Sequence, residues 1–266
     1  MKKLLALVLA LAMVFALAAC SKTETTTTTE PAATETPAAA ESAPAAEPAQ
    51  EAAASTAMSY AEFAAAELDS EVTVEAYIQA KQAYSAEYGN TSLYLQDENG
   101  GYFVYRIGCT QEEYDAMAIG QKISVTGFKS EWAGEVEIAD VSAFAMGEGS
   151  YIAPAADVTD ALGTDGLADH INQFVAMKGL VVEPIGDGAA FLYNWDGSGE
   201  EGSDLYFNVS KDGETYTFTV ESYLCDNTTD VYKTVEGLSI GDVIDMTGFL
   251  YWYNGPNPHI ISVTVK

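Results

Sequence analysis

Apolar and polar side chains alternate over several short stretches of the chain from about residue 70 onward. The alternating apolar positions include Val72, Val74, Ala76, Ile78, Leu93, Leu95, Phe103, Tyr105, Ile123, Val125, Val136, Ile138 and Val141. A period of two, built from β-branched and aromatic residues, is typical of half-buried β-strands. Asn99-Gly100 and Asp212-Gly213 have the composition of tight turns that join two such strands. The pattern therefore predicts a chain that is mostly β.

Three short helical segments are expected between these strands. The first, at 60–68, follows Ser59 and includes Glu62, and these two residues have the spacing of an N-terminal capping box. The other two are expected at 110–118 and 226–238, in the same position within two similar parts of the chain. The predicted fold class is thus all-β with short helices.

One ten-residue segment occurs twice in the sequence. Ile119–Phe128 and Ile240–Phe249 are identical at six of ten positions. The similarity continues through Trp132, which aligns with Tyr253. A duplicated unit that spans several strands favours an organisation into two similar domains.

Each copy contains five strands, with a helix between the third and the fourth, which is the order of an OB-fold. The segment Gly120–Phe128, with the pattern Gly-x-x-Ile-x-x-Thr-Gly-Phe, resembles the fourth strand of OB-type domains in bacterial exported proteins. The resemblance implies two tandem five-stranded Greek-key barrels, at 58–147 and 157–266. Another small barrel or a β-sandwich is the alternative for each domain.

The linker expected between the two domains, at 148–156, is short. We therefore expect the domains to form a fixed pair. Tyr151 and Ile152 are the apolar linker residues that would seal the contact between them.

The chain begins with a segment typical of export signals. Lys2 and Lys3 precede an almost purely apolar run at 4–17, which is shorter than the roughly 20 residues of a membrane-spanning helix. The run ends in Leu17-Ala18-Ala19-Cys20, which resembles the lipobox of bacterial lipoproteins. The resemblance implies that a signal peptide, 1–19, is removed and that Cys20 carries acyl chains such as palmitate. An ordinary signal peptide that happens to precede a cysteine is the alternative.

Residues 20–57 are predicted to form a stalk between the lipid and the domains. After Cys20 this segment contains only Ala, Thr, Glu, Pro, Ser, Gln and one Lys. Such a composition buries too little apolar surface to offset the entropy lost on ordering, so we expect it to be disordered. The protein is therefore expected on the extracytoplasmic face of the cell membrane, held there by its lipid.

The charge of the two domains limits the partners that they can bind. Residues 58–266 contain 8 basic and 34 acidic residues, a net charge of −26. Nucleic acid and anionic lipid surfaces are recognised by clustered Lys and Arg, so this charge opposes both. It favours solubility, cations and basic partners.

Aromatic residues follow the fourth strand in both copies. Tyr251, Trp252 and Tyr253 lie there in the second copy and Trp132 lies there in the first. OB-folds bind ligands across strands two and three and at the loops after strands one and four. These four residues are therefore candidate ligand contacts, although packing within or between the domains is an equally ordinary use of strand aromatics.

The loop 194–204 is rich in oxygen-bearing side chains. Asn194, Asp196 and Ser198 alternate and Asp204 follows, as at the start of a calcium loop. The twelfth position, where a calcium loop has a bidentate Glu, is Leu205. A Ca²⁺ site is one interpretation and a solvated acidic hairpin is the other, and no other cofactor is expected.

Few residues in the two domains suggest catalysis. Cys109 and Cys225 occupy equivalent positions in the two copies, either as a disulfide or as two separate buried thiols. The two histidines, His170 and His259, do not have a zinc-site spacing with cysteines. The sequence has no Gly-x-Ser-x-Gly elbow and no phosphate-binding loop.

The sequence therefore favours a monomeric, non-enzymatic binding protein anchored through Cys20. Its partner would be a cell-wall glycan, a peptide, an envelope protein or a cation. Nucleic-acid binding, by analogy with other OB-folds, is the first alternative. A hydrolase that uses two carboxylates is the second, and it requires two facing acidic groups in an apolar cleft, one of them with a raised pKa.

Overall fold

The computed structural model describes residues 57–266. The predicted signal peptide, the lipidation site Cys20 and nearly all of the predicted stalk lie outside the described residues. Within the described part of the chain, no helix is both long and apolar enough to cross a membrane.

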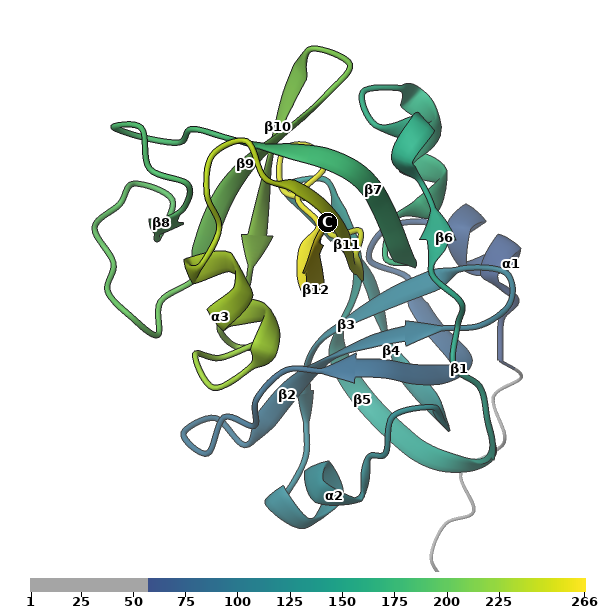
Figure 1. Cartoon of the computed structure of the whole chain (residues 1–266). Helices are drawn as coiled ribbons and strands as arrows, with labels where there is room; N and C mark the ends of the chain where they lie inside the picture. Colours follow the sequence, from purple (N-terminus) through teal and green to yellow (C-terminus); the bar gives the residue numbers. More distant parts are fainter. Residues whose placement is uncertain (1–56) are drawn as a thin grey trace, which may run out of the picture. The chain divides into compact units, whose positions relative to one another are not determined.

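The first domain is a closed five-stranded barrel (Figure 1). Its strands are β1 (Glu71–Lys81), β2 (Asn90–Gln96), β3 (Gly101–Gly108), β4 (Gln121–Trp132) and β5 (Glu135–Ser150). They neighbour one another in the order β1-β2-β3-β5-β4, and β4 closes the barrel by pairing with β1. The pairing of β3 with β5 is parallel.

The second domain repeats this topology with additional short strands. Its strands are β6 (Ala156–Asp157), β7 (Phe174–Glu183), β8 (Leu192–Tyr193), β9 (Leu205–Lys211), β10 (Glu214–Val220), β11 (Val243–Phe249) and β12 (His259–Val265). The order β7-β11-β12-β10-β9 is closed by pairing of β9 with β7, and β10 and β12 are parallel. The strands β7, β9, β10, β11 and β12 thus correspond to β1 to β5, which confirms the predicted pair of OB-fold-like barrels.

The helices are shorter than the sequence pattern predicted. They are α1 (Tyr60–Ala65), α2 (Gln111–Ala116) and α3 (Asp230–Glu236), with 3-10 turns η1 (Thr159–Ala161) and η2 (Asp165–His170) before β7. The predicted capping box at α1 is present, since Ser59 and Glu62 exchange hydrogen bonds. The helix α3 begins only after Thr229, because Asp226 instead accepts from Thr228 N in a preceding turn.

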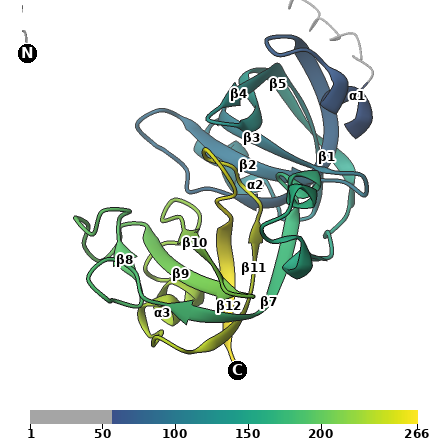
Figure 2. The same cartoon turned by 90° about the horizontal axis from the view of Figure 1, so that it is seen from above.

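Each barrel has its own apolar core, and a third cluster joins them. In this third cluster, Tyr94 of β2 stacks on Phe249 of β11, with 4.5 Å between the ring centroids. Phe103 of β3 and Tyr251 meet edge to face, 5.3 Å apart. Figure 2 shows the ends of β11 and β12 close to β2 and β3. The two barrels therefore share a packed aromatic contact.

The linker prediction needs correction. The strand β5 continues past the expected domain end at residue 147, because Ser150 still pairs with Gln121 of β4. Tyr151 packs on Tyr77 of the first barrel, with 5.4 Å between the ring centroids, and the side chain of Ile152 is 58% exposed. The third core cluster, and not the linker, thus seals the barrels together.

Candidate functional site

The ligand-binding elements of both OB-type barrels converge on one cleft. Two adjacent pockets, with volumes of about 770 and 430 Å³, share Trp132, Glu221, Tyr251 and His259. The smaller pocket is lined by β2, β3 and the loop after β1, and the larger by β9, β10 and the part of the β7–β9 connection that follows β8. These are strands two and three and the first loop of each barrel, where OB-folds bind their ligands. We call the two pockets together the interbarrel cleft.

The floor of the interbarrel cleft is a contact between a tyrosine and a histidine from different barrels. Tyr94 Oη lies 2.6 Å from His259 Nδ1, and the ring of Tyr251 stacks on the imidazole at 4.3 Å. Burial lowers the pKa of His259 to about 3. The imidazole is therefore neutral at physiological pH, and the hydrogen bond fixes its orientation across the two barrels.

The rim of the cleft is made by the loops that follow the fourth strand of each barrel. Trp132 and Tyr253, which align in the sequence repeat, contact one another with 5.0 Å between the ring centroids. Their side chains are 56% and 49% exposed. Asn254 N donates to Ala133 O at 2.7 Å and joins the two loops. Equivalent residues of the two copies thus form one exposed aromatic platform.

The structure separates the four aromatic residues predicted from the sequence. Trp132, Tyr251 and Tyr253 line the cleft together, whereas Trp252 lines a different hollow. The backbone N of Trp252 donates to Glu135 Oε2 at 2.8 Å, and its indole covers Gly134, where a Cβ atom would lie 2.8 Å from Trp252 Cδ1. The structure thus places Trp252 apart from the other three residues, and ligand binding by any of the four stays a prediction.

Two carboxylates lie in the larger pocket. Glu221, which follows β10, accepts from Gln82 Nε2 at 2.9 Å and from Tyr223 N at 3.1 Å. Burial, and then the negative charge of Asp204, raise the pKa of Glu221 to about 7. Asp204 precedes β9 and accepts from Ser222 N at 2.8 Å. The sequence alone does not distinguish Glu221, because the chain has 40 acidic residues and none stands out by spacing.

The smaller pocket adds exposed tyrosines and one basic residue. Tyr88, Tyr105 and Tyr223 are exposed and line this pocket with Arg106. The guanidinium carbon of Arg106 lies 4.9 Å from the ring centroid of Tyr105, which is within the range of a cation–π contact. The alternation of β3 in the sequence included Tyr105 but did not indicate that it borders a cleft.

The predicted calcium loop is held by hydrogen bonds of its own. Asn194 N donates to Asp204 O at 2.8 Å, and Asp196 Oδ1 accepts from Ser198 N at 3.0 Å. Within residues 57–266, no group of three or more His, Cys, Asp or Glu side chains is arranged to hold a metal ion. The loop instead places Trp195, 75% exposed, at the larger pocket. Calcium binding here stays a prediction.

The cysteines and the other histidine lie outside the cleft. Cys109 and Cys225 are free thiols, so the structure does not contain the disulfide that the sequence left open. Burial, with smaller contributions from Glu221 and Asp226, raises the pKa of Cys225 to about 12. His170 closes η2 and contacts Gln173, with 3.1 Å between Nδ1 and Oε1.

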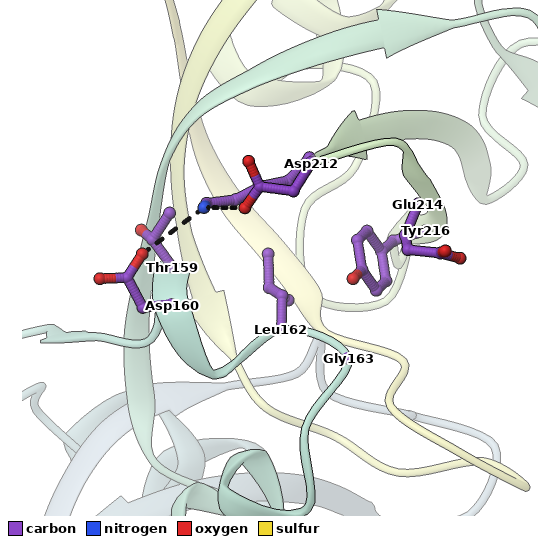
Figure 3. A pocket seen from close by; sticks show the side chains of 8 residues that line it. Thr159, Asp160, Leu162, Gly163, Asp212, Glu214 and Tyr216 are labelled. Carbon is purple, nitrogen blue, oxygen red and sulfur yellow. Dashed lines mark hydrogen bonds and ion pairs between the residues drawn. The ribbon is translucent and has the colours of Figure 1, made fainter.

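A smaller hollow of about 200 Å³ lies beside η1 (Figure 3). Its one lysine, Lys211, is paired with Asp160 at 3.5 Å and with Asp212 at 2.7 Å. In Figure 3 dashed lines mark these two ion pairs at the carboxylates of Asp160 and Asp212. The lysine of this hollow is thus already paired with two carboxylates, and the hollow is less than a third of the size of the larger pocket of the cleft.

No protein-family model and no curated protein matches the sequence. Among solved structures, the tetrameric p202 HIN2 shares 11% identity over 75% of this chain and 96% of that chain, with a TM-score of 0.33. The hypothetical protein ygiW from E. coli shares 13% identity over 36% of this chain and 94% of its own, at 0.26. Asparaginyl-tRNA synthetase from Entamoeba histolytica shares 18% over 34% of this chain, at 0.28, and this chain spans only 23% of the synthetase. Similarities this low carry no inference about function.

Proposed function

We propose that the protein is a lipid-anchored, extracytoplasmic binding protein that holds a small ligand in the interbarrel cleft. The observation that carries this proposal is the convergence of two OB-type ligand faces on adjacent pockets. Exposed aromatic side chains are concentrated there, including Trp132, Trp195 and Tyr253. Concave sites lined by aromatic residues and a few polar groups are typical of small-ligand binding.

The proposed membrane anchor is supported by the N-terminal sequence. The segment Leu17-Ala18-Ala19-Cys20 follows two lysines and an apolar run, as in bacterial lipoproteins. Two or three acyl chains anchor a protein stably, whereas a single chain binds a membrane only marginally. A stalk at 20–57 would then separate the cleft from the lipid surface.

The cleft supports neither nucleic-acid binding nor histidine catalysis. The net charge of −26 on residues 58–266 repels phosphate backbones, and two carboxylates lie in the larger pocket. His259 is buried, with Nδ1 engaged by Tyr94 Oη. Its lowered pKa leaves it a poor proton acceptor near neutral pH.

Ligand binding is tested with the full-length protein in a non-ionic detergent. A thermal-shift screen of glycans, wall fragments, peptides and organic cations should find a ligand that raises the melting temperature, because a ligand stabilises the state that binds it. Trp132→Ala with Tyr253→Ala should abolish the shift. Phe128→Ala removes another exposed aromatic ring, which does not line the cleft, and should preserve it. A shift that survives the double substitution would place the ligand elsewhere.

A second candidate function, a carboxylate-dependent hydrolase, is favoured by one observation. Glu221 and Asp204 lie in the same aromatic cleft, and the pKa of Glu221 is raised to about 7. Glycoside hydrolysis uses a pair of carboxyl groups, one of which has a raised pKa and serves as the acid. Under this hypothesis Glu221→Gln abolishes hydrolysis of a wall glycan while the glycan still binds. Under the binding hypothesis the unaltered protein releases no cleavage product from any ligand that it binds.

A further inference from the structure

The larger pocket of the interbarrel cleft combines aromatic rings with negative charge. Five aromatic side chains line it, namely Trp132, Trp195, Tyr206, Tyr251 and Tyr253. Its acidic groups are Asp204 and Glu221, and none of the described residues that line it is Lys or Arg. Building on the proposed function, we propose that this pocket selects ligands that carry an organic cation, an ammonium or a guanidinium group.

The aromatic faces supply the first attraction for such a group. The negative face of a Trp or Tyr ring attracts a cation within about 6 Å of its centroid, and the attraction strengthens as water is excluded. Trp132 and Tyr253 present a paired platform at the rim, while Tyr251 lies at the floor against His259. A cation between rim and floor would therefore meet rings from both barrels.

The carboxylates supply the second attraction. Glu221 is buried, and its oxygens accept from Gln82 and Tyr223 N. With a pKa of about 7, Glu221 is partly ionised at neutral pH, and no Lys or Arg is among the described residues that line the larger pocket with it. A bound ammonium would provide the missing counter-charge. It would also gain from the strongly negative field of the domains, which concentrates cations at the surface.

Two basic side chains of the first barrel lie over tyrosine rings. Arg106 lies over Tyr105 in the smaller pocket. Lys81, at the end of β1, places its ammonium 3.8 Å from the ring centroid of Tyr114. These contacts show that tyrosine faces in this part of the fold accept both guanidinium and ammonium groups. The size of the pocket, about 770 Å³, suits an organic cation and far exceeds a bare metal ion.

The proposal is tested with choline and with 3,3-dimethyl-1-butanol, which replaces the charged nitrogen by carbon and keeps the shape. The full-length protein in non-ionic detergent is titrated with each compound by calorimetry. Choline should bind at least tenfold more tightly than its neutral isostere, because only the charged compound gains the cation–π contacts. Equal affinities, or binding of the isostere alone, would overturn the cation proposal.

Variants separate the cation proposal from the wider proposal of a binding cleft. Trp132→Ala and Glu221→Gln should each weaken choline binding at least threefold, while Phe128→Ala leaves it unchanged. The melting temperature of each variant shows whether it is folded. If choline fails to bind but a neutral glycan binds and requires Trp132, the cation proposal fails and the binding cleft stands. If no ligand of any class depends on Trp132, the proposed function fails as well.

Discussion

Glu135 is the buried carboxyl group on which the contact between the barrels can be tested most directly. Its side chain is fully buried, and Oε2 accepts from Trp252 N at 2.8 Å. Its other oxygen, Oε1, and Asn172 Oδ1 are buried without a hydrogen-bond partner. Burial raises the pKa of Glu135 to about 8, with a smaller contribution from Glu137, although the hydrogen bond from Trp252 N opposes the shift. The carboxyl group is thus protonated in the folded protein at neutral pH.

The sign of the pH dependence follows from the two states. In the unfolded chain Glu135 has its ordinary pKa of 4.5, so between pH 4.5 and 8 only the folded protein holds the proton. Folding then becomes less favourable as pH rises, by about 1.4 kcal/mol per pH unit. The full shift from 4.5 to about 8 corresponds to about 5 kcal/mol. The pKa of Glu221 is raised to about 7, so this residue also makes the folded protein less stable as pH rises.

Glu135→Gln removes the titrating proton, and with it this pH dependence of folding, but keeps the shape of the side chain. The amide oxygen can still accept from Trp252 N. Between pH 5 and 8, we expect the free energy of unfolding of the variant to rise relative to that of the unaltered protein by about 1.4 kcal/mol per pH unit. The measurement is urea unfolding at pH 5, 6, 7, 8 and 9, and Glu131→Gln, which changes an exposed carboxylate of β4, is the matched control. A stability difference that stays constant from pH 5 to 9 would refute the argument.

Three further substitutions test the anchor and the packing. Cys20→Ser should abolish incorporation of labelled palmitate, and continued labelling would place the lipid elsewhere. Gly101→Ala should lower the free energy of unfolding in urea by about 1–3 kcal/mol, because its Cβ would lie 2.2 Å from a backbone oxygen of the second barrel. Gly108→Ala in the same strand is the control. Its Cβ meets open space, so it should change stability by less than about 1 kcal/mol. Tyr94→Phe should cost about 1–3 kcal/mol because it leaves buried His259 Nδ1 unpaired, and an unchanged unfolding midpoint would contradict this.

The repeat in the sequence was sufficient to predict the architecture. Ile119–Phe128 and Ile240–Phe249 include most of β4 and all of β11, the strands that pair with β1 and β7 in the two barrels. Alternation fixed which side of each strand faces its core, because a strand with one buried face has a specified register. These are local properties of the chain, so one sequence could show them.

The composition of the candidate site depended on contacts that are distant in sequence. Gln82 donates to Glu221, although 139 positions separate them, and no spacing rule connects such residues. Beyond the end of β11 the regular strand alternation stops, and Trp252 forms only an isolated bridge with Pro256. The sequence therefore indicated that aromatics gather after the fourth strand but could not show that Trp252 turns away from the cleft.

The residues that join the two barrels also position the side chains that line the interbarrel cleft. Glu135 binds the backbone of Trp252, the residue between Tyr251 and Tyr253, and both tyrosines line the cleft. The carboxyl group therefore holds the middle of the segment whose two neighbours supply the floor and the rim. Because Trp132 meets Tyr253 only while the barrels are in contact, neither barrel contains the aromatic platform alone. Duplication of one barrel thus provides a cleft that a single copy does not have.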